Sequence, residues 1–282
     1  MDKVESRILI EELETDGHSP MKFICSDGLM YYVKYRSGKS LDKNEINCLV
    51  FEMVCTRLLQ QLDIPVPDQA LVTINENSYG PGQLKVNKKY IKNGVIAWGS
   101  KEIVRADLIK EIEQIQKKTD FNKLKNPDDL IRIAIFDLWV DNVDRHSGNY
   151  NLLVKMEGGK LQIITIDHAF TFGGLKGMNI FNAASVPHPY KKLIESQYFR
   201  SVVKHFNKFE RLEIASQFLS LLLGLDIENL INEVFAQIPP QWGINPTLKK
   251  RIIDFLQSKQ RITTLQQICK QQLQKNFRRK KL

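Results

Sequence analysis

The stretch DNVDRHSGNYNLLV, residues 141–154, contains two aspartates, three asparagines, an arginine and a histidine directly before an apolar run. The β-like segments NLLVKM and KLQIITI flank the turn-forming residues 157–159, which predicts a hairpin. A hairpin brings together the residues that flank its two strands. We therefore expect Asp144 and Asn149, which precede the first strand, to lie close to Asp167, which follows the second.

These three side chains have the chemistry of a metal and phosphate site. Two carboxylates and an amide oxygen are hard ligands of the type that Mg²⁺ prefers, with phosphates and waters completing its octahedron. A carboxylate outside the metal shell can orient an attacking hydroxyl. The alternative is that Asp144 and Asn149 are turn and capping residues, as most loop Asp and Asn residues are. Their spacing alone favours neither interpretation.

Lys34 favours the phosphate interpretation. It ends the strand-like segment YYVK and precedes a helical segment that carries Glu45 and Glu52 on one face. A strand lysine paired with a helix glutamate positions the nucleotide phosphates in enzymes of the kinase fold. Alone, Lys34 would be an ordinary solvated lysine at a strand end. Upstream of the aspartate and asparagine cluster, it predicts a kinase-type site.

Together these segments resemble a known family. NVDRHSGNYNLLV followed by IITIDHAFTFGG resembles the catalytic and metal-binding segments of the HipA-like kinases, a bacterial branch of the protein-kinase-like fold. It is also similar to the DRHxxN and DFG-type segments of phosphoinositide lipid kinases. The strand lysine, the Asn-Glu at a helix start, the IPVP turn and the later IPPQW resemble the small HipA-like proteins. The resemblance covers about residues 20–175 in order.

The resemblance implies roles for five residues of the segment 141–151, here called the polar loop. Asp144 would be the catalytic aspartate, which accepts or orients the substrate hydroxyl, and Asn149 would bind Mg²⁺. His146 would either assist charge stabilisation or order the loop by hydrogen bonding. Asn151 would be structural or would compete with Asn149 as the metal ligand. Arg145 would brace the loop rather than touch substrate.

The resemblance also assigns the nucleotide contacts. Asp167 would hold Mg²⁺ against the ATP phosphates together with Asn149. Lys34 would contact the α- and β-phosphates, with Glu45 as its first candidate partner and Glu52 as the second. ATP and Mg²⁺ are the implied cofactors.

Three departures from the family pattern leave the substrate open. His168-Ala169 stands where protein kinases carry Phe-Gly, and Ser147-Gly148 lacks the catalytic-loop lysine of full-length HipA toxins. A phosphate-covering loop placed at Gly28 is poor in glycine. We expect a serine/threonine kinase acting on a protein, such as a translation factor, within a toxin–antitoxin pair. The alternatives are a small-molecule or lipid kinase of this fold, and a nucleotide-binding pseudokinase or interaction module.

The order of segments predicts an α+β, bilobal, protein-kinase-like fold. A β-rich N-lobe with one helix is expected over residues 1–99, and a larger helical C-lobe over residues 100–282. The segment Val95–Lys101 is the expected hinge. The finer predictions are a strand hairpin at 21–35, a helix at 44–62, strands at 69–74 and 83–91, helices at 100–118 (with Ser100 as N-cap) and 127–143, and four or five helices between 190 and 277.

Composition adds the remaining expectations. The chain has 282 residues, 43% of them hydrophobic, and a net charge of +9, which favours acidic partners without requiring nucleic acid. Cysteines without a CxxC pair, no signal peptide and no membrane-length apolar run predict a cytoplasmic protein with no membrane partner. An antitoxin partner is a further implication of the family. Candidate autophosphorylation sites near the phosphates are Ser26, Ser37 and Ser40.

Overall fold

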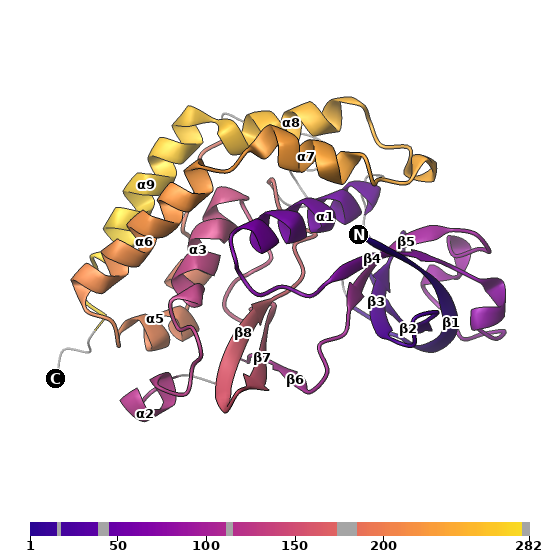
Figure 1. Ribbon diagram of the computed structural model, residues 1–282, viewed down its shortest axis with the longest axis horizontal. Coiled ribbons are helices and arrows are strands. Elements are labelled where there is room, and N and C mark those ends of the chain that lie inside the picture. The colour runs from indigo at the N-terminus through magenta and orange to yellow at the C-terminus, as the bar shows by residue number, and fades with distance from the viewer. Residues whose placement is uncertain (16–17, 39–44, 111–114, 174–184, 278–282) are drawn as a thin grey trace.

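A closed five-stranded barrel forms the N-terminal part of the protein in the computed structural model, which describes residues 1–15, 18–38, 45–110, 115–173 and 185–277. The strand order is β1-β2-β3-β5-β4 (Figure 1). Burial alternates along β2, and along β3 as far as Val33, because successive side chains point to opposite faces of a strand. The strands are β1 (Asp2–Glu12), β2 (Met21–Cys25), β3 (Met30–Lys34), β4 (Gln69–Thr73) and β5 (Ile96–Lys101).

The hairpin predicted over residues 21–35 is confirmed as β2 and β3. Met21 pairs with Val33 and Ile24 with Met30, so the turn lies at one end of the hairpin and Lys34 at the other. Gly28 occupies the turn with a φ of +79°, a conformation that glycine adopts without strain.

Helix α1 (Glu45–Gln61) confirms the helix predicted over residues 44–62. Its predicted apolar face is buried, and so are Phe51 and Glu52 on other faces, because the helix lies between the barrel and α7 (Ile227–Phe235) (Figure 1). All four cysteines are free and buried, and Cys48 and Cys55 lie within this helix as small core residues.

Two local predictions are wrong. No helix begins at Ser100, because that residue lies in β5 between Tyr32 of β3 and Gln69 of β4. The chain then forms the short strand β6 (Ala106–Leu108), while residues 111–114 lie outside the described residues. Backbone pairing on both sides overrides the helical pattern of the side chains.

The strand expected over residues 83–91 is also absent, and that described segment contains the 3₁₀ helix η2 (Asn87–Lys89) instead. The Glu12 carboxylate accepts hydrogen bonds from the backbone N–H groups of Lys85, Val86 and Asn87. These backbone donors are therefore satisfied without a strand partner. Strand β1, which carries Glu12 at its end, was not among the predicted elements, although it pairs with β2 and β4.

The second sheet has the order β6-β7-β8 and contains the predicted hairpin, β7 (Leu152–Glu157) and β8 (Lys160–Thr165). Leu152 pairs with Thr165, so the residues just before β7 and just after β8 lie side by side, as the sequence predicts. The boundary expected between residues 99 and 100 falls inside β5, whose last paired residue is Lys101.

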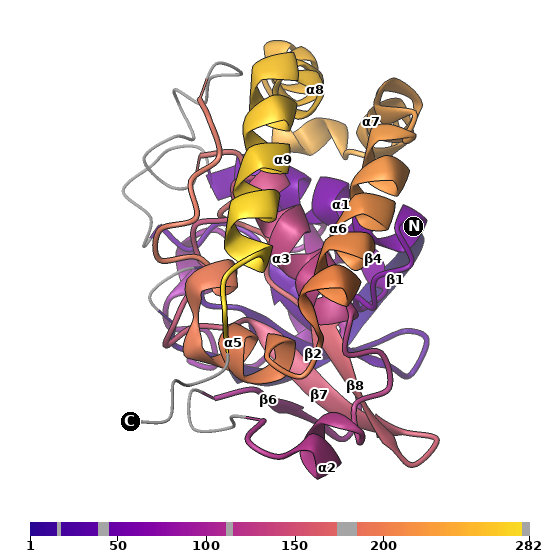
Figure 2. The same cartoon turned by 90° about the vertical axis from the view of Figure 1, so that its left-hand side faces the viewer.

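Helices make up most of the remaining chain, and α3 packs against α6 and α9 (Figure 2). Within the described residues no single helix is long and apolar enough to cross a bilayer; α6 and α7, bent by 63°, pass that test only as a pair. The helices are α2 (Lys118–Phe121), α3 (Asp129–Trp139), α5 (Gln197–Val203), α6 (Lys208–Leu223), α8 (Thr247–Gln257) and α9 (Lys259–Leu273), with the 3₁₀ turns η1 (Glu76–Ser78), η3 (Leu193–Glu195) and η4 (Pro240–Trp242).

Candidate functional site

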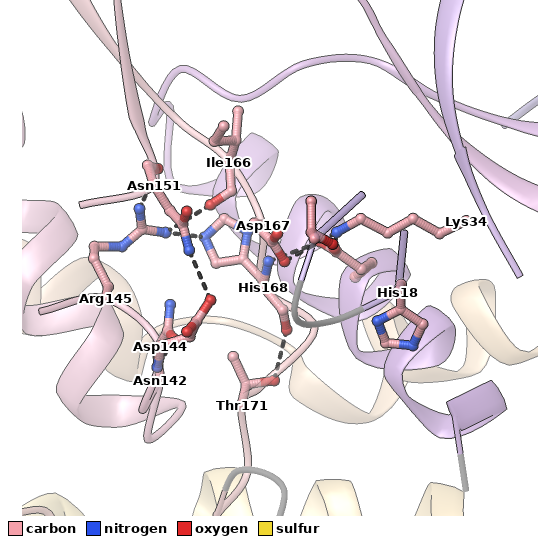
Figure 3. A network of polar contacts seen from close by, with 12 residues as sticks. His18, Lys34, Asn142, Asp144, Arg145, Asn151, Ile166, Asp167, His168 and Thr171 are labelled. Atoms are coloured by element: carbon pink, nitrogen blue, oxygen red, sulfur yellow. Dashed lines mark hydrogen bonds and ion pairs between the residues drawn. The ribbon is translucent and has the colours of Figure 1, made fainter. Parts of the chain in front are cut away.

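Lys34, the last residue of β3, forms two ion pairs at the centre of the candidate site (Figure 3). Its Nζ lies 2.7 Å from Glu52 Oε1 and 3.0 Å from Asp167 Oδ1. Burial lowers the pKa of Lys34, but the carboxylates of Asp167 and Glu52 outweigh it and hold that pKa above its usual value. Lys34 is therefore a buried, permanently charged ammonium.

The partner of the lysine is Glu52, and the prediction that favoured Glu45 is wrong. Glu45 lies seven residues earlier on α1, about 10 Å along the helix axis. Its carboxylate accepts hydrogen bonds from the backbone N–H groups of Ser37 and Gly38 and from the Ser37 hydroxyl. Glu45 therefore fixes the chain that follows β3, and Ser37 is committed to that contact.

Glu52 links three parts of the fold. One carboxylate oxygen holds Lys34, and the other accepts a 2.8 Å hydrogen bond from the His168 backbone N–H. Burial raises the pKa of Glu52 to about 7, against the opposing effect of Lys34. The carboxylate thus ties β3, α1 and the segment after β8 together.

Asp167 turns the chain after β8 and presents its carboxylate to Lys34. Its φ of 56° lies in the left-handed region, which Asp tolerates better than most residues. Burial pushes its pKa upward, but Lys34 outweighs burial and lowers the pKa of Asp167 to about 2. The side chain is 35% exposed, so the ionised carboxylate remains accessible.

A pocket of about 440 Å³ opens beside Lys34 and Asp167. Its volume lies in the range of small-molecule and cofactor sites. The expected hinge borders it, and the wall continues beyond that segment to Leu108. The lining residues that come from different parts of the chain include Leu13 and Pro20, Tyr32 and Trp98, Ser100 to Ile103, Leu153 and Ile166.

Leu13 and Pro20 of the β1–β2 connection line this pocket, whereas the turn at Gly28 does not. The hairpin register places Gly28 and Ser26 at the end of β2 and β3 far from Lys34. Ser26 Oγ instead accepts a hydrogen bond from the Glu5 backbone N–H. The proposal of Ser26 as a site beside the phosphates is therefore wrong, and Ser40 lies outside the described residues.

His18, a residue of the site that the sequence patterns do not predict, comes from the β1–β2 connection (Figure 3). Its Nε2 lies 3.4 Å from the Glu45 carbonyl, and its ring stacks on Phe170 at 6.0 Å. Burial and the nearby Lys34 lower the pKa of His18, so the ring is neutral. The polar run TDGHSP before β2 was the one signal for it.

Asp144 lies on the loop between α3 and β7 with its carboxylate held in place. Asn151 Nδ2 donates to Asp144 Oδ2 at 2.9 Å, and the Asp144 N–H donates to Asn142 Oδ1 at 3.1 Å (Figure 3). Burial and the negative charge of Asp167 raise the pKa of Asp144. Asn151 is thus in direct contact with the predicted catalytic carboxylate.

Asn149 closes the same loop. Its Nδ2 donates to the Asp144 carbonyl at 3.1 Å, and its backbone pairs with His146 in both directions. His146 Nδ1 donates to the Ser147 carbonyl at 2.7 Å, which is the loop-ordering role. A part for His146 in charge stabilisation stays a prediction.

Arg145 is fully buried and braces the polar loop, as predicted from the sequence. It joins α3, the polar loop and the segment after β8, because a guanidinium carries five N–H donors. Its partners are Asp137 Oδ2 (2.8 Å), the carbonyls of Tyr150 (2.7 Å), Asn151 and Ile166 (3.0 Å), and His168 Nε2 (3.0 Å).

The residues present fit Mg²⁺ bound jointly with phosphate oxygens. Within the described part of the chain, no three His, Cys, Asp or Glu side chains cluster as a ready-made metal site. Asp167 and Asn149 offer hard oxygens, and Mg²⁺ is commonly held by one or two protein oxygens together with substrate phosphates and waters.

Comparison with solved structures places this fold among the kinases. The chain is similar to the Helicobacter pylori proinflammatory kinase CtkA, with a TM-score of 0.58 and 12% identity over 95% of this chain and 98% of that one. It is also similar to the Golgi casein kinase solved with Mn/ADP bound, with a TM-score of 0.50 and 12% identity over 97% and 74% of the two chains.

The family model for HipA-like kinases matches residues 9–280. The chain therefore belongs to the HipA-like kinase family, as the polar segment and Lys34 suggested. Among proteins of curated function, none matches it significantly.

Proposed function

We propose that the protein is a Mg-ATP-dependent phosphotransferase that phosphorylates a serine or threonine hydroxyl of a protein. The barrel up to Lys101 would be the N-lobe and the remaining chain the C-lobe of a bilobal kinase. The observation that carries the proposal is the double ion pair of Lys34 with Glu52 and Asp167 beside a pocket of about 440 Å³. Family membership supports a kinase.

Each residue then has a defined task. Lys34 contributes a fixed positive charge toward the nucleotide phosphates, and Glu52 orients it. Asp167 and Asn149 would hold Mg²⁺, which when bound neutralises charge on the phosphates. The neutral His18 ring uses its Nε2–H on the Glu45 carbonyl, so it ties the β1–β2 connection to the start of α1.

Asp144 would act on the acceptor. Asn151 donates to its Oδ2, and because each carboxylate oxygen has two lone pairs, Asp144 can still accept the proton of the substrate hydroxyl. As the hydroxyl oxygen bonds to the γ-phosphorus, the bond from that phosphorus to the β–γ bridging oxygen breaks and ADP leaves. The raised pKa of Asp144 makes it a better proton acceptor than an exposed aspartate.

Thermal unfolding with and without Mg-ATP tests nucleotide binding. Ligand at 100 times its dissociation constant stabilises the native state by about 2.7 kcal/mol. We expect a metal-dependent rise in Tm for the wild type and for Asp254→Asn, a matched change in an exposed pair on α8. Asp167→Asn should lose the rise. No rise for the wild type at millimolar Mg-ATP would contradict the proposal.

A further inference from the structure

The segment between α7 and α8 reaches across the molecule to the barrel (Figure 1). It contains IPPQW, residues 238–242, to which the proposed chemistry assigns no role. We define the clasp as Glu233, Gln241 and Trp242, three residues of this region whose side chains contact α1 or β5.

The clasp completes β5 where β3 ends. The last pair between these strands is Lys34 with Trp98, so β3 offers no partner to Ile96, the first residue of β5. The Ile96 N–H instead donates to Gln241 Oε1 at 3.1 Å, and the Ile96 carbonyl accepts from Trp242 Nε1 at 2.7 Å. Two side chains thus satisfy backbone groups that would otherwise be unpaired.

The local sequence fixes these two side chains. Pro239 and Pro240 cannot continue a helix, so the chain turns into η4 after α7. Gly243 ends η4 with a φ of 58°, which glycine adopts without strain. Trp242 is buried, and its indole N–H is satisfied by the Ile96 carbonyl rather than by water.

Ile96 lies two residues before Trp98, which lines the pocket and touches the lysine. Lys34 Nζ lies 5.6 Å from the centre of the Trp98 ring, and Trp98 Nε1 donates to Gln69 Oε1 at 2.9 Å. By fixing Ile96 at the start of β5, the clasp also restrains the Trp98 indole that packs on Lys34.

The third residue of the clasp, Glu233 of α7, contacts α1. Arg57 donates to Glu233 Oε2 from Nη2 at 2.8 Å and from Nε at 3.2 Å. Arg57 lies five residues after Glu52 on the same helix. A second anchor from the helical part, Arg132 of α3, donates to the carbonyls of Leu62 and Asp63 just beyond α1.

We propose that Gln241 and Trp242, assisted by Glu233, are positioning residues for the phosphotransfer site. They fix β5 and α1 on either side of Lys34, so the contact of Lys34 with Glu52 and Asp167 is assembled before nucleotide binds. This proposal rests on the proposed function. The IPPQW segment, residues 238–242, would thus contribute to nucleotide affinity although this segment does not line the pocket.

The test compares Gln241→Ala with Gln237→Ala, a nearby glutamine whose side chain donates to the Glu233 carbonyl within its own helical segment. We expect Gln241→Ala to raise KM for ATP about fivefold, the factor that a net hydrogen bond is worth, with a smaller change in kcat. Trp242→Phe, which keeps an aromatic ring and removes the N–H donor, should act in the same direction. Gln237→Ala should leave KM unchanged.

Amide hydrogen exchange without nucleotide gives an independent readout. Exchange at Ile96 should rise in Gln241→Ala, which removes the acceptor of its N–H, and not in Gln237→Ala. If the wild type binds Mg-ATP and Gln241→Ala has an unchanged KM for ATP, the positioning role is wrong. If the wild type binds no Mg-ATP, the proposed function itself fails.

Discussion

Glu52 on α1 and His168 after β8 are joined by a 2.8 Å hydrogen bond from the His168 backbone N–H to Glu52 Oε2. Because Glu52 Oε1 holds Lys34, one carboxylate fixes both the lysine and the turn that presents Asp167. The bond uses the backbone of His168, so it does not depend on the Phe-Gly pair that this chain lacks.

Glu52→Gln should impair nucleotide use far more than Glu45→Gln. The first change removes the negative partner of a buried ammonium, whereas Glu45 holds the backbone at Ser37 and Gly38 and makes no ion pair with Lys34. A hydrogen bond to a charged group is worth about 1.5–3 kcal/mol, so we expect kcat/KM for ATP to fall about 10- to 100-fold. Steady-state kinetics of both variants checks this, and equal losses would contradict the pairing.

Asp137→Ala should destabilise the fold. It leaves the buried Arg145 guanidinium without its carboxylate 2.8 Å away. Breaking a buried pair costs about 3–5 kcal/mol. Urea unfolding measures the loss, with Arg200→Ala, at an exposed helix position, as the control expected near zero. A loss below about 1 kcal/mol would refute the bracing role.

Stability should decline as pH falls below 6.5, in part because of His168. Burial and the nearby Arg145 hold the pKa of His168 well below its ordinary value of 6.5, and its Nε2 accepts from Arg145. The unfolded chain therefore binds a proton in this range that the native state excludes, at up to about 1.4 kcal/mol per pH unit.

His168→Gln should reduce this dependence between pH 6.5 and 5, measured as the slope of the free energy of unfolding. The exposed His188→Gln provides the control with an unchanged slope. Identical slopes in the wild type and His168→Gln would exclude His168 as a source of the pH dependence.

The acid limb of the pH–rate profile should lie above pH 3.8, because burial and Asp167 raise the pKa of Asp144 and the base must be ionised. The hydrogen bond from Asn151 lowers that pKa, so Asn151→Ala should move the limb to higher pH. Profiles of kcat/KM for both proteins check this. A limb that does not move would mean that Asn151 does not tune Asp144.

Local patterns predicted the parts of the site that depend on order along the chain. The hairpin after Asn149 could be predicted because its turn and its alternation of apolar and polar residues are local features. It brings Asp144 close enough to Asp167 for the two charges to interact. The choice between Glu45 and Glu52 was not local, because both lie on one face and tertiary packing decides which one meets Lys34.

Pairing between residues far apart in the sequence explains the larger errors in the predicted elements. Ser100 lies in a helix-like sequence but pairs with strands on both sides, and β1 is recognised only by its two neighbours. The covering loop was placed at Gly28 because glycine is the usual signal, whereas barrel closure brings Leu13 and His18 to the site. The clasp on Ile96 likewise joins residues about 145 positions apart.

Transfer of γ-labelled phosphate from ATP to protein acceptors, compared between the wild type and Asp144→Asn, tests the central claim most directly. Asp144→Asn should retain the rise in Tm with Mg-ATP, because Lys34, Glu52 and Asp167 are unchanged. Its transfer rate should fall about 10²- to 10⁴-fold, the usual contribution of a general base. Transfer at the wild-type rate by Asp144→Asn, or no transfer by a wild type that binds Mg-ATP, would contradict the assignment.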